Sequence, residues 1–274
     1  MMNKGFEIAA SYQSRNSTEG FNYRIAANLT YITNEVVKFR GGNSPDQLYL
    51  IREGYSYQSL YGYNALGVFQ SDEEGRSYMG NNAYIPSAGD LKYEDVNGDG
   101  RLNYLDKKSL GNTIPKFTFG LNLGFSYRNW SLDVVTSGAA GVNAYTQSAW
   151  TQPLGISGGV ITERWRNAWT PENKSNTLPL IKINDTWNRY ESSFWVQNLS
   201  YFKIKNIQLS YALPQSVLTK LKISGASVYA NVQNLPAFVS GDYEGFDPER
   251  NTFDSGGSLY PTPFISSIGI NLQF

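Results

Sequence analysis

The twelve residues from Asp95 to Asp106 carry side chains that could hold a metal ion. Oxygen-bearing side chains stand at positions 1, 3, 5 and 12 of the calcium-loop template, and they are Asp95, Asn97, Asp99 and Asp106. Arg101, at position 7, would contribute its main-chain carbonyl. Carboxylates crowded into so short a segment repel one another unless a hard cation compensates their charge. The spacing therefore predicts a calcium site.

Two features limit what this loop could do. The residue at position 12 is Asp106, whose side chain is one carbon shorter than the bidentate Glu of the template, so the affinity should be weak. No long amphipathic helices flank the loop, so we expect a structural ion rather than a calcium sensor. The alternative is an Asp-, Asn- and Gly-rich turn that never holds metal.

Catalytic chemistry finds little support in the sequence. The chain has no Cys and no His, which excludes disulfides, thiolate metal sites and the commonest general base. Glycosidases need two carboxylates at a fixed separation, and nothing pairs the scattered acids Glu163, Asp185, Glu244 and Asp247. We therefore expect no enzymatic activity. The formal net charge of zero gives no sign of a nucleic-acid partner.

The elements that position these residues are β-strands with one apolar and one polar face. Between residues 117 and 127, aromatic and leucine side chains alternate with Thr, Gly, Asn and Ser, and residues 6–12 and 21–31 show the same period of two. Further strands are expected at about 130–145, 197–213, 224–239 and 263–274. The alternation changes phase near Lys205-Asn206, which predicts a β-bulge.

The last eight residues resemble the C-terminal insertion signal of bacterial outer-membrane β-barrels. Apolar side chains alternate up to a terminal aromatic, and the residues that would form the signal are Ser267, Gly269, Leu272 and Phe274. The composition agrees with a transmembrane barrel, because 20 Tyr, 14 Phe and 6 Trp accompany a mean hydropathy of −0.40. No apolar run approaches the roughly 20 residues of a membrane helix. A soluble all-β domain with tyrosine-rich turns is the alternative.

Connection lengths predict the orientation of the strands. Outer-membrane barrels have short periplasmic turns and long external loops. Connections at about 14–19, 128–129 and 214–222 are short, whereas those at about 35–115, 146–196 and 240–262 are long. Short and long connections alternate if seven strands cross the membrane and the strand-like segment 57–69 lies within an external loop. The calcium-like loop 95–106 then also lies outside.

Seven strands cannot close an antiparallel barrel, because closure needs an even number. An open edge in lipid leaves backbone groups without partners. The sequence also begins without a charged and apolar signal segment. We therefore expect residues 1–274 to be the C-terminal part of a larger barrel.

Four groups of segments, in order along nearly the whole chain, resemble SusC/RagA-type TonB-linked outer-membrane transporters. The segments are 86–102 (PSAGDLKYEDVNGDGRL) with 110–122 (LGNTIPKFTFGLN); 52–55 (REGY) with 61–63 (YGY) and 67–70 (GVFQ); 164–165 (RW) with 169–173 (WTPEN); and 201–207 (YFKIKNI) with 232–235 (VQNL).

The resemblance implies a transmembrane barrel of about 22 strands around a plug, of which this chain would supply about seven to eight C-terminal strands. It implies outer-membrane import of oligosaccharides, or of peptides, driven through the TonB complex, with a SusD-like surface lipoprotein as partner. The signal peptide, TonB box and plug of the family have no counterpart in these residues. A passive binding or adhesion barrel is the alternative function. For the loop tryptophans Trp150, Trp165, Trp169 and Trp187, packing within girdle or loop is favoured over stacking on sugars.

Overall fold

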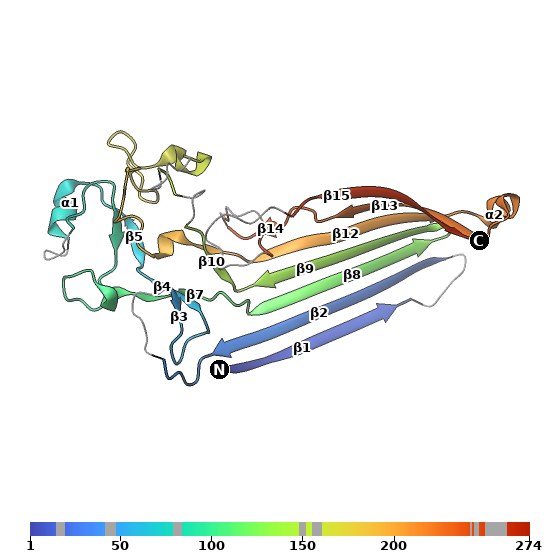
Figure 1. Cartoon of the computed structure of the whole chain (residues 1–274), viewed down its shortest axis with the longest axis horizontal. Helices are drawn as coiled ribbons and strands as arrows, with labels where there is room; N and C mark the ends of the chain where they lie inside the picture. The colour runs from blue at the N-terminus through green and yellow to red at the C-terminus, as the bar shows by residue number, and fades with distance from the viewer. Residues whose placement is uncertain are drawn as a thin grey trace.

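The computed structural model describes residues 1–14, 20–41, 48–78, 84–147, 152–154, 161–241, 243, 247–249 and 262–274. One long antiparallel sheet forms most of the molecule, and three small sheets with short helices stand at one of its ends (Figure 1). None of the described helices is both long and apolar enough to cross a membrane.

Seven long strands form the main sheet, each antiparallel to its neighbours, and this confirms the predicted open, all-β architecture. In spatial order they are β1 (Met2–Gln13), β2 (Phe21–Glu35), β8 (Phe117–Tyr127), β9 (Trp130–Ala140), β12 (Tyr201–Ala212), β13 (Gly225–Gln233) and β15 (Ile265–Gln273). The short β14 (Phe238–Val239) also pairs with the first residues of β12. Within the described residues, no strand pairs with the outer edge of β1 or of β15.

The predicted bulge in β12 is confirmed, and it explains the change of phase in the sequence. The register between β12 and β9 shifts between Ile204 and Asn206, so that Lys205 is the additional residue. Because of this shift, Ile204 pairs with Thr136 while Ile207 pairs with Val134, and both isoleucines stay on the same face.

One face of the main sheet is apolar, and its aromatic residues gather at the two ends of the strands. Near the loop end the Phe6–Tyr31, Tyr31–Phe117 and Phe119–Phe202 ring centroids lie 5.5, 4.9 and 6.5 Å apart. Near the opposite end the corresponding pairs are Tyr12–Tyr23, Phe21–Phe125 and Trp130–Tyr211, at 5.6, 6.0 and 4.7 Å. Mostly aliphatic and small side chains fill the space between, such as Ala10, Ala27, Leu121, Val134 and Ile207.

No second sheet covers this face among the described residues. Its large side chains are exposed, including Phe6, Ile8, Phe21, Tyr127, Trp130, Leu209, Ile268 and Ile270. The opposite face carries small and polar residues, for example Asn28, Gly120, Asn122, Ser131 and Asn271. Their face follows from the register, because residues paired directly across two strands lie on the same face of the sheet. The main sheet is thus a single layer with one apolar and one polar face.

The connections between strands alternate in length as predicted. Arg128-Asn129 forms the minimal turn between β8 and β9, with Arg128 in the left-handed region at φ 52°. The connection at 214–222 is short as predicted, and it contains the helix α2 (Gln215–Leu221), which the sequence analysis did not anticipate. Most of the turn at 14–19 lies outside the described residues.

The strands predicted at 130–145, 197–213 and 224–239 are shorter in the structure. β9 stops at Ala140, and Asn143–Tyr145 forms a separate strand, β10, that pairs with β11 (Val196–Asn198). Gly141, which follows β9, has φ 70°, a conformation that breaks the extended backbone. Similarly, β13 ends at Gln233, and Asn234 follows it with φ 56°.

The first two of the three long connections lie at the same end of the main sheet and pack into one body (Figure 1). We call this body the loop assembly. It comprises the described residues of 48–115 and 141–200. Its elements are β3 (Tyr49–Leu50), β4 (Ser59–Gly62), β5 (Ala65–Val68), α1 (Asp72–Ser77), β6 (Leu91–Tyr93), β7 (Lys108–Gly111), β10, β11 and 3₁₀ turns at Tyr104–Asp106, Glu163–Asn167 and Ser193–Trp195. Segment 57–69 contributes β4 and β5 to it, and so lies outside the main sheet as predicted.

Two aromatic cores hold the loop assembly together. One contains Tyr63, Val68, Leu91, Tyr93, Trp169 and Trp187, and the other contains Leu60, Tyr145, Trp165, Ala168 and Trp195. Both cores join residues of the first long connection to residues of the second. Burial of this apolar surface therefore stabilises the association of two segments far apart in the chain.

Candidate functional site

The acids of the predicted calcium loop accept hydrogen bonds from the loop's own backbone. Asp95 accepts from the N–H groups of Gly98 and Gly100, at 2.7 and 2.9 Å. Asp99 accepts from the N–H of Arg101 at 2.8 Å, and the Asn97 side chain accepts from the N–H of Asp99 at 3.0 Å. These bonds shape a tight turn in which Gly98 and Gly100 both have positive φ.

Asp106 closes the loop from inside. It is fully buried, and its carboxylate accepts from the N–H groups of Val96 at 3.0 Å and Asn103 at 2.8 Å. Asn103 in turn caps the 3₁₀ turn through the N–H of Leu105. Among the described residues, no three acids come together closely enough to hold a metal ion. Calcium binding by Asp95, Asn97, Asp99, Arg101 and Asp106 stays a prediction. A bound cation would compete with the backbone N–H groups for the carboxylate oxygens.

The residues of the predicted assembly signal lie in and just beyond β15. Ser267 pairs with Asn231, and Leu272 pairs with Ala226 on the apolar side. Gly269 pairs with Tyr229, whose ring occupies the space where a Cβ at Gly269 would stand. Phe274 follows the last strand residue and is 93% exposed. The signal therefore occupies a strand whose outer edge no described residue pairs with, and its role in assembly stays a prediction.

Asp90 is the main polar junction of the loop assembly. This fully buried carboxylate accepts from Lys182 Nζ at 2.5 Å and from Asn188 Nδ2 at 3.0 Å, both in the second long connection. Within its own segment it accepts from the N–H of Ser87 at 2.9 Å and the hydroxyl of Tyr84 at 3.1 Å. Asp90 belongs to the motif 86–102 that resembles the transporter family, and in the structure it joins the two connections.

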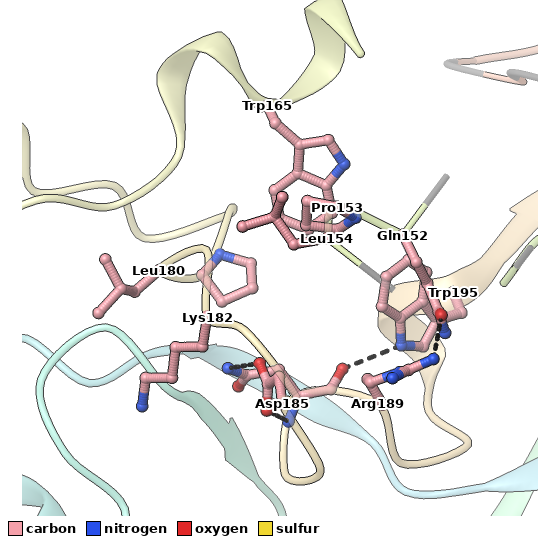
Figure 2. A pocket seen from close by; sticks show the side chains of 11 residues that line it. Gln152, Pro153, Leu154, Trp165, Leu180, Lys182, Asp185, Arg189 and Trp195 are labelled. Carbon is pink, nitrogen blue, oxygen red and sulfur yellow. Dashed lines mark hydrogen bonds between the residues drawn. The ribbon is translucent and has the colours of Figure 1, made fainter. Parts of the chain in front are cut away.

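A small cavity lies beside this junction (Figure 2). It has a volume of about 20 Å³, and Trp165, Trp195, Lys182, Asp185 and Arg189 are among its lining residues. Burial raises the pKa of the Asp185 carboxyl, although hydrogen bonds from Asn188 act in the opposite direction. Such a volume suits about one water molecule, so the cavity cannot take a sugar or a peptide.

The loop tryptophans serve packing, as the sequence analysis favoured. Trp165, Trp169 and Trp187 are all buried within the two aromatic cores. The indole N–H of Trp187 donates to the carbonyl of Leu91 at 2.8 Å. Trp150 lies outside the described residues. Trp165, Trp169 and Trp187 therefore form no sugar-stacking surface.

The scattered acids do not form a catalytic pair among the described residues. Glu163 forms an exposed ion pair with Arg166, and Asp185 accepts from Asn188 inside the loop assembly. Asp247 contacts Lys203 on the main sheet. Glu244 lies outside the described residues. These acids therefore occupy three separate environments.

The polar face of the main sheet carries two groups of charged residues. Near the turn end, Arg24 and Asp133 approach to 3.7 Å across Gly124, beside an open groove of about 250 Å³. Near the loop end, Lys203 and Lys205 contact Asp247 and Glu249. This second group was not predicted from the sequence, in which the change of phase at Lys205 was the only signal near it.

Known proteins share both the sequence and the fold of this chain. TonB-dependent receptor P3 of Formosa agariphila is 28% identical over 297 residues, which cover 99% of this chain and 28% of the relative. TonB-dependent receptor SusC of Bacteroides thetaiotaomicron is 26% identical, over 94% of this chain and 25% of the relative. No family model matches the chain. The chain thus spans about a quarter to a third of the length of these relatives.

Solved structures of the RagAB peptide transporter and of the RagAB peptide importer in its open-open state superpose with TM-scores of 0.74 and 0.73. Identity is 23% and 24%, over 99% of this chain and 29% and 28% of those chains. The predicted resemblance to SusC/RagA-type TonB-linked transporters is therefore confirmed. These relatives are named as receptors and transporters rather than enzymes, in agreement with the expectation from the scattered acids.

Proposed function

We propose that this chain forms part of the barrel wall of a TonB-linked outer-membrane transporter that imports oligosaccharides or peptides. The observation that carries the proposal is the two-sided main sheet. Its exposed apolar face lies between two rows of aromatic residues, and its other face is polar. Aromatic girdles around an apolar band, with a polar interior, are the pattern of strands that cross a membrane.

The size of the apolar band fits a bilayer. Ten residue steps separate Phe117 from Tyr127, which at about 3.4 Å per residue gives about 34 Å along the strand. A tilt of about 40° reduces this to about 26 Å along the membrane normal, close to the roughly 25 Å band of outer-membrane barrels. In water the same face would expose an apolar surface across seven strands, which a soluble protein avoids.

The edges of the main sheet support a larger barrel. β1 begins at the loop end and β15 finishes at the opposite end, so the seven strands cannot close antiparallel on themselves (Figure 1). In lipid, each free edge would leave backbone N–H and C=O groups without partners. We infer that further strands pair with β1 and β15 in a protein as long as the relatives. A plug and the segment that contacts TonB would come from the same additional length.

The names of the relatives support the class of cargo, and a SusD-like lipoprotein partner is part of the proposal. RagAB is named a peptide importer, and SusC a TonB-dependent receptor, which supports uptake of peptides or glycans as the general activity. We infer that the loop assembly, at the end of the sheet where the long connections gather, faces outward. It would then offer the surface on which a SusD-like lipoprotein sits.

Uptake measurements in cells that carry the whole gene test this function. Fluorescent oligosaccharides and peptides are offered to the producing strain, to a strain lacking the gene, and to the producing strain treated with a protonophore. A transporter requires accumulation that depends on both the gene and the proton gradient. Surface binding that survives the protonophore without any accumulation would instead support the passive binding barrel.

A further inference from the structure

Two lysines at the bulge in β12 meet on the polar face. Lys203 pairs in register with Ser137 of β9, and Lys205 is the additional residue of the bulge. A regular strand places residues i and i+2 on the same face about 7 Å apart, whereas a bulge redirects the extra side chain. Here both ammonium groups reach the same carboxylate, Glu249, at 3.2 and 2.5 Å.

The acids that meet these lysines belong to the connection between β14 and β15. Lys203 also lies 2.8 Å from the Asp247 carboxylate. Ser137 Oγ donates to Glu249 at 2.8 Å, and the N–H of Glu249 donates to Asp247 at 3.0 Å. Two positive and two negative charges therefore balance one another within this cluster, and Pro248 is buried between the two acids.

Burial makes the loss of either partner of this contact more costly than in a surface ion pair. The side chains of Lys203 and Asp247 are only 4% and 6% exposed. Burial, the largest single influence, would raise the pKa of the Asp247 and Glu249 carboxyls, but the hydrogen bonds and positive charges around them, those of the lysines included, together lower both pKa values. A buried charge that loses its partner is strongly destabilising, so each half of the cluster requires the other.

We propose that Asp247-Pro248-Glu249 is an acidic latch that docks on the Lys203–Lys205 pair and fixes this turn against the inner wall of the main sheet. The inference goes beyond the proposed transport function and does not depend on the cargo. The latch holds a piece of a long connection on the polar face near the loop end, where a solute moving along that face would meet it. Release of the latch would expose both lysines and the hydroxyl groups of Ser137 and Tyr201.

The absence of cysteine from the chain allows a direct test. Pro248→Cys introduces the one thiol of these 274 residues, at a buried position, and any cysteine in the rest of the whole protein is first replaced by serine. The reaction of this thiol with a membrane-impermeant maleimide reports how often the turn leaves the wall. The measurement uses the whole protein, folded in outer-membrane preparations. In the parent we expect slow labelling, and rapid labelling there would itself overturn the docked turn.

Charge variants are then added to Pro248→Cys. Asp247→Asn with Glu249→Gln, and separately Lys205→Glu, should each accelerate labelling by at least about tenfold, because buried partners are removed or opposed. The charge exchange Lys205→Glu with Glu249→Lys restores a neutral cluster and should return labelling toward the parent rate. The matched control is Arg24→Met, which breaks the exposed Arg24–Asp133 pair on the same face and should leave labelling unchanged.

Besides rapid labelling in the parent, three results with the variants would overturn the latch. They are unchanged labelling after loss of the turn's carboxylates, equal acceleration by Arg24→Met, and no recovery in the charge exchange. The turn-side variants leave the strand lattice intact, so a general failure to fold is distinguished from release of the turn. Uptake results do not enter this test, so the latch and the transport function can fail independently.

Discussion

Lys182 and Asp90 form an ion pair of 2.5 Å that joins the two long connections across 92 residues of sequence. The aspartate is fully buried and the lysine is about a quarter exposed. Asn188 reaches the same carboxylate and also accepts from the N–H of Leu91 at 2.6 Å. The loop assembly is therefore held by a satisfied polar junction as well as by its aromatic cores.

The first prediction concerns this junction. Asp90→Ala leaves Lys182 and Asn188 without their acceptor, and loss of one partner of a buried pair typically costs about 3–5 kcal/mol. We expect the loop assembly to become protease-sensitive and its amides to exchange faster, while the main sheet stays protected. Hydrogen exchange followed by mass spectrometry of the whole protein measures both regions at once.

A matched control for Asp90→Ala is Glu163→Gln, which removes the exposed Glu163–Arg166 pair. Exposed pairs contribute about 0–1 kcal/mol, so exchange in the loop assembly should hardly change. Equal protection in Asp90→Ala and the parent would show that the aromatic cores alone hold the two connections together.

The second prediction compares the two faces of β8 at adjacent positions. Leu121 lies on the apolar face and Asn122 on the polar face, both midway along the strand. An arginine on the lipid side at the membrane centre costs about 2–4 kcal/mol, whereas one that faces the interior stays hydrated. Leu121→Arg should therefore lower the yield of folded protein in the membrane, and Asn122→Arg should not. The fraction of heat-modifiable protein on a gel measures folding, and the reverse order would contradict the assignment of the faces.

Much of the main sheet was predictable because strand periodicity is local information. Alternation in residues 117–127 and its change of phase at Lys205 indicate one strand and one bulge without knowledge of any partner. The turn at Arg128-Asn129 was similarly visible. In contrast, α2 was missed because its seven residues are too few to show a helical period.

The polar junctions could not be predicted for a different physical reason. Asp90 meets Lys182, and Lys203 meets Asp247, although the partners lie 92 and 44 residues apart in the sequence and one partner of each pair lies in an irregular connection. No periodicity relates such partners, and charge alone leaves many pairings open. Only the packing of the aromatic cores and the register of β12 decide which acid reaches which lysine.

The third prediction separates the assembly signal from the stability of the sheet. Phe274 lies beyond β15 and is almost fully exposed, so its side chain adds little to the fold. Phe274→Ser should lower the amount of protein inserted in the outer membrane several-fold, while inserted molecules unfold at the parent's denaturant concentration. Gln273→Ser, one position earlier on the polar side, is the control. A loss of stability in the inserted Phe274→Ser protein would mean that this ring packs against another part of the barrel.

The fourth prediction is a dependence of the loop assembly on pH. The pKa of the Glu94 carboxyl lies below its ordinary value in the folded protein. The main cause is a hydrogen bond from Lys108, and the next is a hydrogen bond from Asn64. A carboxyl whose pKa is lowered by folding stabilises the fold above its ordinary pKa of 4.5, and this contribution is lost as the pH falls through the lowered value. Protease resistance of the loop assembly should therefore fall as the pH drops below about 4.5, and less steeply in Glu94→Gln. Identical profiles for the two proteins would exclude this pair as a source of acid sensitivity.

The fifth prediction tests the calcium loop with a variant that the geometry selects. Asp106 is unsuitable, because its buried carboxylate organises the backbone of Val96 and Asn103 even without metal. Asp99 is exposed, and Asp99→Asn removes a charge while an amide oxygen can still accept from the N–H of Arg101. Loops of this kind in extracellular modules bind calcium with dissociation constants of about 10⁻⁴–10⁻³ M.

We therefore expect millimolar calcium to protect residues 95–106 of the parent from proteolysis, and a chelator to remove that protection. Asp99→Asn should show the metal-free cleavage rate under both conditions, because a ligand charge is missing. Glu73→Gln, an acid outside the loop, controls for general effects of calcium on an acidic surface. If calcium leaves cleavage of the parent unchanged, the hydrogen bonds of Asp95, Asp99 and Asp106 to the backbone are the whole reason for the acids in this loop.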